Sequence, residues 1–282
     1  MINRFFERAV GTELDHFLLG VADLEFKSYF FADCSRLAYH DGGVAKKYFK
    51  RVGFTTYKFF DVEGAQCHIA QTKDIIIISF RGTEPKEFSD VKADLNAWKG
   101  KSRTEGMVHK GFKGELDKLW ADISVALQRI GDRKLYICGH SLGGAMATIC
   151  ASRLEEHTPE LYTYGSPRVG GKEFVKGLQV LHYRFVNNND MVTRLPFWIM
   201  GFRHHGVLTY INHYGNIRNL TAWQRCKDQF RGRWAAIRKL QLFDGIRDHD
   251  IGKYANKLKV KFQKRTVEDV YSPEELDVHR ES

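Results

Sequence analysis

The sequence predicts an α/β fold in which a mostly parallel central sheet is flanked by helices. Apolar runs of strand length alternate along the chain with segments of helical periodicity, which is typical of such sheets. Residues 75–80 are apolar on both faces, as expected of a parallel strand covered by helices. A second apolar run, 135–138, leads through a tight turn at Ser141 directly into a segment of small residues.

The composition limits the class of protein. The chain has 282 residues, 43% hydrophobic and 13% aromatic, which suits a folded protein with a sizeable core. No apolar run approaches the roughly 18 residues of a spanning helix, and residues 1–8 lack the apolar stretch of a secretory signal. Five irregularly spaced cysteines argue mildly for a reducing compartment. We expect a cytoplasmic protein or one exported without a signal.

The positive charge is concentrated late in the chain. Residues 218–265 hold fourteen Lys or Arg against four Asp, whereas residues 266–282 hold six acids and one Arg. Residues 221–242 read as an amphipathic basic helix, which either docks on an anionic membrane or packs on the core with its charges exposed. We expect one domain over 1–265 followed by an acidic, flexible tail over 266–282.

The elements before and after the central strand follow from periodicity. Residues 12–39 have apolar side chains at helical intervals, and the segments 54–61 and 65–71 predict two strands joined at Glu63 and Gly64. The other expected elements are helices over 115–130 and from 142 to about 157, and strands over 161–164, 181–186 and 207–211.

The turn at Ser141 has the pattern G-x-S-x-G, formed with Gly139 and Gly143. The pattern alone occurs by chance in many glycine-rich loops. Here a strand precedes it and a helix follows at once, which is the context of a nucleophile elbow. A Cβ at either glycine would collide with the neighbouring strand or helix. Ser141 is therefore the candidate nucleophile.

An oxyanion hole requires backbone N–H groups at the carboxyl end of a strand beside such an elbow. The strand 75–80 runs into Arg81, Gly82 and Thr83. Thr83 is placed to offer its N–H and its hydroxyl, and Leu142 to offer a second N–H. Taken alone, the same residues are equally typical of a plain turn after a strand.

Several segments, in this order, resemble signatures of the class 3 lipases, the fungal-lipase-like branch of the α/β-hydrolases. They are FRGTEP at 80–85, VHKGF at 108–112, GHSLGGA at 139–145 and YGSPRVG at 164–170. Residues 186–196 are similar to the segment that holds the catalytic aspartate of that family. The resemblance covers roughly residues 60–255 and implies the α/β-hydrolase fold.

The acid and the base follow the serine in this architecture. Asp190 follows a predicted strand and is the candidate carboxylate, because an Asx turn suits the preceding Asn187, Asn188 and Asn189 better. Five histidines come after it: 204, 205, 213, 249 and 279. Residues 247–254 resemble the D-H-x-x-x-x-Y segment around the base of the family, which selects His249. A metal site of the other histidines lacks any zinc spacing.

The resemblance also implies a lid between the oxyanion strand and the next element. Within 84–99, one face of a short predicted helix carries Phe88, Val91, Leu95 and Trp98. The alternative is a fixed surface helix. Phe197 and Trp198, together with the basic helix, suggest an apolar rim above the serine.

The resemblance therefore implies a serine hydrolase of the triacylglycerol lipase type that needs no metal or cofactor. Its expected partners are a lipid ester and, peripherally, an anionic membrane or a lipid droplet. A phospholipase A1-type enzyme and a short-chain esterase remain alternatives, as does a catalytically silent membrane-binding relative. The net charge of +10 also suggests nucleic-acid binding as an alternative function, but the sequence has no recognised nucleic-acid-binding motif. The sequence does not constrain the oligomeric state.

Overall fold

The computed structural model describes residues 24–83, 98–212, 214–218 and 248–270. Its strands are β1 (Thr56–Val62), β2 (Ala65–Gln71), β3 (Ile75–Phe80), β4 (Lys99–Lys101), β5 (Met107–His109), β6 (Lys134–His140), β7 (Glu160–Tyr164), β8 (Leu181–Asn187), β9 (Val207–Ile211) and β10 (Ile217–Arg218). Its helices are α2 (Leu24–Leu37), α3 (Gly42–Arg51), α5 (Lys110–Leu127), α6 (Leu142–Arg153), α7 (Lys172–Gly177) and α10 (Ile251–Val270). Three 3-10 turns are η1 (Glu155–His157), η2 (Val192–Arg194) and η3 (Trp198–Met200).

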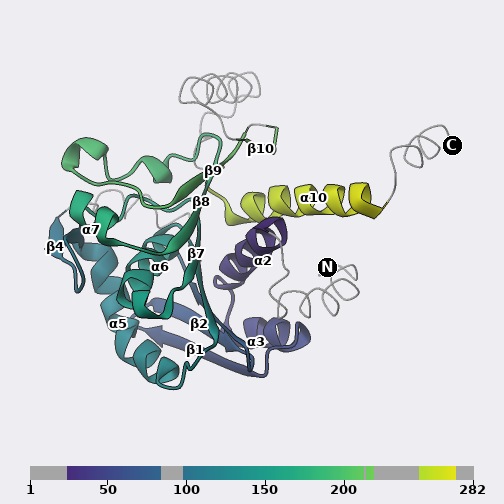
Figure 1. Ribbon diagram of the computed structural model, residues 1–282, viewed down its shortest axis with the longest axis horizontal. Coiled ribbons are helices and arrows are strands. Elements are labelled where there is room, and N and C mark those ends of the chain that lie inside the picture. Colours follow the sequence, from purple (N-terminus) through teal and green to yellow (C-terminus); the bar gives the residue numbers. More distant parts are fainter. Residues whose placement is uncertain (1–23, 84–97, 213, 219–247, 271–282) are drawn as a thin grey trace.

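The described residues form one large sheet with the strand order β1-β2-β3-β6-β7-β8-β9-β10 (Figure 1). The four pairs from β3 to β9 are parallel, and β1, β2 and β10 join the sheet antiparallel. Strands β4 and β5 form a separate antiparallel pair. The predicted mostly parallel sheet is therefore confirmed.

The central strand β3 separates two apolar cores because its side chains alternate between the faces of the sheet. Ile75 and Ile77 pack with residues of α2, α3 and α10, whereas Ile76 and Ile78 pack with residues of α5, α6 and α7. All six residues of β3 are buried. Helices on both faces explain why this strand is apolar throughout.

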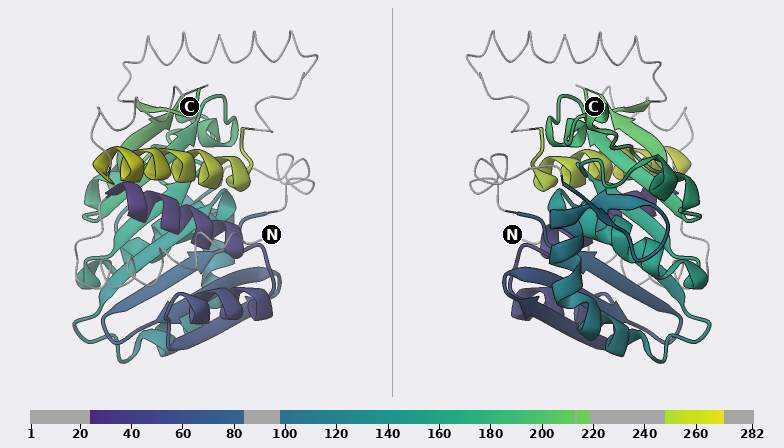
Figure 2. Two further views of the ribbon diagram at one scale, coloured as in Figure 1. Left: turned by 90° about the vertical axis from the view of Figure 1, so that its right-hand side faces the viewer. Right: turned by 90° about the vertical axis from the view of Figure 1, so that its left-hand side faces the viewer.

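The ends of the described chain meet on one face of the sheet. Helices α2 and α10 lie side by side there, and α5 and α6 cover the opposite face (Figure 2). Phe262 packs on Phe26 with ring centroids 5.6 Å apart, and Lys261 pairs with Glu25 at 2.7 Å. Helix α10 is thereby fixed against the sheet directly after the segment that carries His249.

Most of the predicted elements within the described residues are confirmed, including the hairpin, whose turn residues Glu63 and Gly64 both have positive φ. Helix α3 was not anticipated. It begins with two glycines, Gly42 and Gly43, because the Asp41 carboxylate caps the N–H groups of Gly43 and Val44. Helix α5 begins earlier than expected because the His109 ring caps its first turn.

Some expectations remain untested. The division into one domain over 1–265 and a tail stays a prediction, and α10 continues through Val270. The first part of the helix expected over 12–39 and the basic helix expected over 221–242 lie outside the described residues. None of the helices in the described part of the chain has the length and hydrophobicity that a bilayer crossing requires.

Candidate active site

Ser141 alone joins β6 to α6. Its φ of 59° and ψ of −127° are strained for a residue with a side chain, and such strain costs about 1–3 kcal/mol and clusters at functional sites. The turn is held because the Ser141 N–H donates to the carbonyl oxygen of Tyr164 at 3.0 Å. The Ser141 carbonyl oxygen accepts from Gly144 and Ala145. The backbone therefore has the sharp turn that the sequence predicts.

The glycines around Ser141 permit close packing at this turn. A Cβ on Gly139 would collide with the backbone of Gly143, and a Cβ on Gly143 would collide with the carbonyl oxygen of Phe80. The first turn of α6 thus packs directly on the end of β3. A side chain at either position would separate the serine from the neighbouring strand.

Ser141, His249 and Asp190 form one buried chain of hydrogen bonds. Ser141 Oγ lies 2.8 Å from His249 Nε2, and His249 Nδ1 lies 3.0 and 2.9 Å from the two Asp190 carboxylate oxygens. The three residues are at most 5% exposed. A neutral imidazole carries one ring proton, so Nδ1 donates to Asp190 while Nε2 accepts from the serine hydroxyl. This arrangement suits proton transfer from Ser141 to the imidazole.

The Asp190 carboxylate has three further neighbours. Tyr254 donates its hydroxyl to Oδ2 at 2.6 Å, and the Val192 N–H donates to Oδ1 at 2.9 Å. The Val192 contact is an Asx turn, so Asp190 makes this local contact while it also faces His249. A Cβ on Gly165 would lie 2.7 Å from Oδ2 and 2.9 Å from His249 Nδ1. The backbone of Gly165 therefore lies directly against the acid–base contact.

Asp248 connects the acid loop to the base. Its carbonyl oxygen accepts from Asn187 Nδ2 at 2.8 Å, and its carboxylate accepts from Asn188 Nδ2 at 3.1 Å and from the Asn189 N–H at 3.2 Å. The three asparagines that precede the candidate acid are thus bonded to the residue that precedes His249. The contacts of Asn187 and Asn188 use their side-chain amides, which explains asparagine at these two positions, whereas position 189 uses its backbone N–H.

His140 lies beside His249, with the ring centroids 4.4 Å apart. Its Nε2 is 2.6 Å from the carbonyl oxygen of His249, and its Nδ1 is 2.7 Å from the hydroxyl of Tyr39. A carbonyl oxygen only accepts, so Nε2 carries the proton and Nδ1 accepts from Tyr39. Burial, and secondly the charge of His249, lowers the pKa of His140 well below its usual value. The ring therefore stays neutral.

The residues expected to form an oxyanion hole flank the elbow. Leu142 is the first residue of α6. A Cβ on Gly82 would lie 3.2 Å from the Ser141 Cβ, so the backbone that leads to Thr83 approaches the serine closely. Thr83 itself is half-buried.

The residues expected to form the lid and the rim divide into two groups. Phe88, Val91 and Leu95 lie outside the described residues. Trp98, Phe197 and Trp198 are on the surface, and they are 71%, 58% and 64% exposed.

The other candidate histidines have different neighbours. His204 Nε2 lies 2.8 Å from the Thr193 carbonyl oxygen, and the Nδ1 atoms of His182 and His205 lie 3.1 Å apart. Among the described histidines that follow the acid, only His249 has a hydrogen bond to Ser141.

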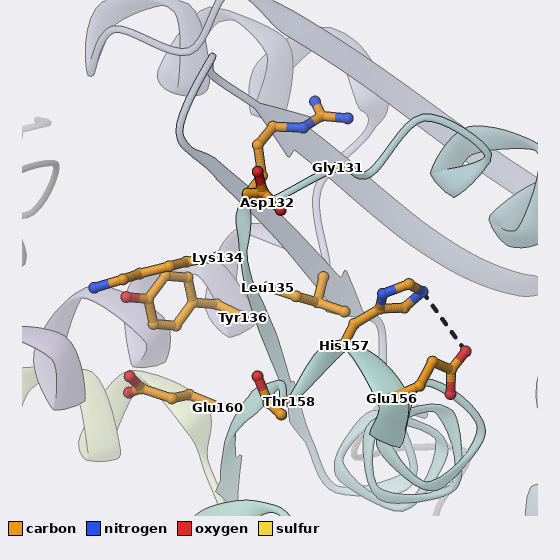
Figure 3. Close-up of a pocket in the computed structure, with 10 residues that line it drawn as sticks. Gly131, Asp132, Lys134, Leu135, Tyr136, Glu156, His157, Thr158 and Glu160 are labelled. Carbon is orange, nitrogen blue, oxygen red and sulfur yellow. Dashed lines mark ion pairs between the residues drawn. The ribbon is translucent and has the colours of Figure 1, made fainter.

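A pocket of about 460 Å³ lies at the other end of β6 (Figure 3). It is lined by residues 131–136, 156–158 and 160, and these include the first residues of β6 and β7. Ser141 follows the last residue of β6. This pocket is therefore at the sheet edge opposite the candidate site.

The sequence analysis singled out Ser141, Asp190 and His249, and the structure brings them together. It gave no role to Tyr39, His140, Gly165 or Tyr254. Tyr254 stands in the D-H-x-x-x-x-Y segment and Gly165 in the YGSPRVG segment, so both were visible as letters of a motif. Tyr39 had no local signal, because its contact with His140 joins positions far apart in the chain.

Known proteins similar to this chain are lipases and a toxin. A toxin, TseL of Vibrio cholerae, is 44% identical over 94 residues, which are 32% of this chain and 15% of the toxin. The secreted mono- and diacylglycerol lipase 1 of Fusarium solani is 40% identical over 106 residues, which are 34% of this chain and 32% of that lipase. The chain thus spans less than a third of the length of either relative.

Solved lipase structures share the fold. The triacylglyceride lipase of Rhizomucor miehei superposes with a TM-score of 0.61 at 21% identity, over 81% of this chain and 94% of that one. A triacylglycerol lipase whose catalytic centre is a serine protease triad gives a TM-score of 0.55 at 25% identity, over 65% of this chain and 78% of that one. Residues 77–200 match the family model described as lipase (class 3). The chain is therefore similar to class 3 lipases over these residues, and it has the α/β-hydrolase fold.

Proposed function

We propose that the protein is a serine hydrolase that cleaves the carboxylic esters of lipids. Ser141 is the nucleophile, His249 the general base and Asp190 the carboxylate that orients it. The observation that carries this proposal is the hydrogen-bonded chain from Ser141 Oγ through the imidazole to the Asp190 carboxylate, with contacts of 2.8 to 3.0 Å. The strained backbone at Ser141 supports the same roles.

In the first half of the proposed reaction, Ser141 Oγ attacks the ester carbonyl carbon and its proton passes to His249 Nε2. The Asp190 carboxylate stabilises the imidazolium. The N–H groups of Thr83 and Leu142, with the Thr83 hydroxyl, stabilise the negative oxygen of the tetrahedral intermediate. Collapse of the intermediate breaks the ester C–O bond, and the alcohol leaves with the proton from His249.

In the second half, water replaces the alcohol. His249 takes a proton from the water as its oxygen attacks the acyl-enzyme carbonyl. The second tetrahedral intermediate releases the fatty acid, and Ser141 regains its proton from His249. The cycle uses only side chains and backbone groups of this chain and one water molecule.

Acylglycerols are the substrates we propose first. The similar protein of Fusarium solani is a mono- and diacylglycerol lipase, and a structural relative is a triacylglycerol lipase. Phospholipids and short-chain esters are the competing substrates within the same reaction class. The basic stretch 218–265 makes peripheral contact with an anionic membrane or lipid droplet part of this proposal.

We further propose that segment 84–99, with Phe88, Val91, Leu95 and Trp98, acts as a lid. Ser141 is fully buried, so an ester reaches its Oγ only after a covering segment has moved. Phe197 and Trp198 then form the rim that the acyl chains contact. A lipid surface favours the open form because it binds the apolar face of the lid.

Covalent labelling tests the assignment of the nucleophile. An alkyl fluorophosphonate should label the native protein stoichiometrically, and peptide mass spectrometry should find the adduct on Ser141. The Ser141→Ala variant should remain unlabelled, and Ser152→Ala, which removes a buried hydroxyl on α6, should label like the native protein. An adduct on another residue, or equal labelling of Ser141→Ala, rejects the proposal.

A further inference from the structure

Two histidines outside the candidate site share a hydrogen bond. His182 on β8 is 3% exposed, and its Nδ1 lies 3.1 Å from the Nδ1 of the half-buried His205. The two rings are 21° from parallel, with centroids 5.3 Å apart. A hydrogen bond between two imidazole nitrogens needs a proton on one of them and a lone pair on the other. The contact therefore depends on how many protons this histidine pair holds.

The neighbours of the histidine pair determine where its protons lie. Burial lowers the pKa of His205, while a hydrogen bond to the backbone of Leu178 acts in the opposite direction, as a carbonyl acceptor does. Nδ1 of His205 faces His182, so Nε2 donates to that carbonyl and Nδ1 is left as an acceptor. His182 then donates from Nδ1, and its Nε2 accepts from the Thr163 hydroxyl at 2.8 Å. The neutral pair thus holds two protons and uses all four ring nitrogens.

Positive and titratable groups face the histidine pair. A cavity of about 10 Å³ beside it is lined in part by Arg184, Arg203 and His204. The lining residues contributed by α6, by α7 and by the turn after β7 carry no ionisable side chain. Burial, and secondly the charge of His205, lowers the pKa of His182 well below its usual value, and Arg184 acts in the same direction. A third proton is therefore unfavourable on His182.

A carboxylate lies near His205. The charge of Glu155 in η1 opposes the effect of burial on the pKa of His205, and the charge of Arg184 adds to that effect. Glu155 Oε1 accepts from the Gln179 N–H at 2.8 Å, next to the peptide carbonyl that His205 contacts. A third proton on His205 occupies Nδ1 and points at the His182 proton across 3.1 Å. The charged ring is thus repelled by His182 and attracted by Glu155.

The histidine pair closes the segment that returns from the candidate acid to the sheet. Residues 191–206 connect Asp190 to β9, which lies beside β8 in the sheet (Figure 1). Within this segment, His204 Nε2 lies 2.8 Å from the Thr193 carbonyl oxygen, and the Thr193 hydroxyl donates to the Asp190 carbonyl oxygen at 2.9 Å. The segment is thus held at its start by the acid loop and at its end by the histidine pair.

We propose that the histidine pair is a pH-sensitive latch, in which proton uptake moves His205 from His182 to Glu155. A Cβ on Gly206 would lie 2.5 Å from His182 Cγ, so the backbone beside His205 packs directly on that ring and loosens when His205 leaves. Because burial lowers the pKa of His205 in the closed form, the open form binds the proton first as the pH falls below about 6.5. Opening of segment 191–206 is therefore favoured in mildly acid solution. The latch concerns this segment and not the reaction, so it goes beyond the proposed hydrolysis.

Hydrogen exchange measured by mass spectrometry tests the latch without any hydrolysis. The full-length Ser141→Ala protein is compared at about pH 7.5 and about pH 5.0, and each exchange rate is divided by the intrinsic rate at that pH. Peptides within 191–206 should lose about tenfold or more in protection at the lower pH, whereas peptides of β3 and α6 should change less than about twofold. Because the variant lacks the proposed nucleophile, the result does not depend on whether the proposed activity is correct.

Three further substitutions, each made in this protein, assign the response. His205→Gln keeps a donor and an acceptor but takes up no proton, so protection of 191–206 should differ less than about twofold between the two pH values. The matched control His157→Gln removes a histidine of η1 that lies 3.6 Å from Glu156, and it should respond to pH like its parent. Glu155→Gln removes the carboxylate that receives His205, and the midpoint of the exchange transition should fall by about half a pH unit or more.

Three results would overturn the latch proposal. The first is equal protection of 191–206 at the two pH values in the Ser141→Ala protein. The second is an unchanged pH response in His205→Gln, or its loss in His157→Gln, because a different group would then take up the proton. The third is an unchanged midpoint in Glu155→Gln, because the charged ring would then not move to that carboxylate.

Discussion

His140 donates its Nε2 proton to the backbone carbonyl oxygen of His249, and the two rings lie 4.4 Å apart. The contact joins the last residue of β6 to the residue proposed as the base. Because Tyr39 donates to the other ring nitrogen, the proton of His140 has only one position. The backbone of His249 is thereby fixed relative to the elbow.

Replacing His140 by phenylalanine keeps a ring beside His249 but removes both hydrogen bonds. The carbonyl oxygen of His249 would lose its buried partner, at a cost of about 1–3 kcal/mol. We expect kcat to fall about tenfold with KM unchanged, since the base loses its fixed orientation and the substrate contacts remain. Tyr39→Phe should have the same direction and a smaller effect. A KM increase with unchanged kcat would contradict this positioning role.

Gly165→Ala should abolish activity. The added Cβ would meet Asp190 Oδ2 and His249 Nδ1 at 2.7 and 2.9 Å, and the φ of +58° is itself unfavourable for alanine. The matched control is Gly114→Ala in α5, where an added Cβ meets nothing within 4 Å. The control should keep full activity and gain up to about 1 kcal/mol in stability. Ester hydrolysis and thermal unfolding distinguish the two variants, and an active Gly165→Ala protein would contradict the site geometry.

Thr83→Val tests the hydroxyl in the proposed oxyanion hole. It removes the hydroxyl and preserves the backbone N–H and the branched shape. If the hydroxyl stabilises the oxyanion, kcat should fall on the order of 100-fold, while Thr83→Ser should stay near the native value. Steady-state kinetics on a soluble ester measure both. If Thr83→Val keeps the native kcat, the hydroxyl does not stabilise the oxyanion and Thr83 contributes only its backbone N–H.

His68 should make stability depend on pH. It is 1% exposed, and burial lowers its pKa to about 4, below the value of about 6.5 in the unfolded chain. As the pH falls, the unfolded chain therefore binds the proton first. The contribution of His68 to stability is complete above pH 6.5 and is lost between pH 6.5 and about 4, to a total of about 3 kcal/mol.

Urea unfolding at pH 7.5 and pH 4.5 measures this loss. Between pH 7.5 and pH 4.5, the free energy of unfolding should fall less in His68→Gln than in the native protein, because the variant lacks one group that binds a proton on unfolding. The comparison isolates His68 from the other buried histidines, which change equally in both proteins. If the free energy of unfolding falls equally in the two proteins, His68 is not the source of the pH dependence.

The strands and the elbow could be predicted from sequence because their signals are local. The apolar run 75–80 indicates a buried strand, and the small residues after Ser141 indicate a helix packed closely on the sheet. Each pattern lies within one element. The position of α3 could not be read as easily, because a single cap at Asp41 overcomes two glycines with poor helix propensity.

The partners of the candidate site are harder to predict because they meet only in the fold. His140 and Tyr39 are 101 positions apart, and His140 and His249 are 109 apart. No periodicity relates such positions. The selection of His249 among five histidines depended on a resemblance, and its geometry with Ser141 was beyond any pattern in the chain.

Hydrolysis of a medium-chain ester, titrated through its solubility limit with the native protein and Ser141→Ala in parallel, tests the central proposal most directly. We expect the native rate to rise sharply once droplets form and the variant to lose about 10⁴-fold or more of that rate. If the rate saturates below the solubility limit but still requires Ser141, the proposed lid is wrong and the protein is an esterase. Equal rates from the two proteins, or no hydrolysis of this ester and of phospholipid by either, would contradict the assignment of Ser141 as the nucleophile.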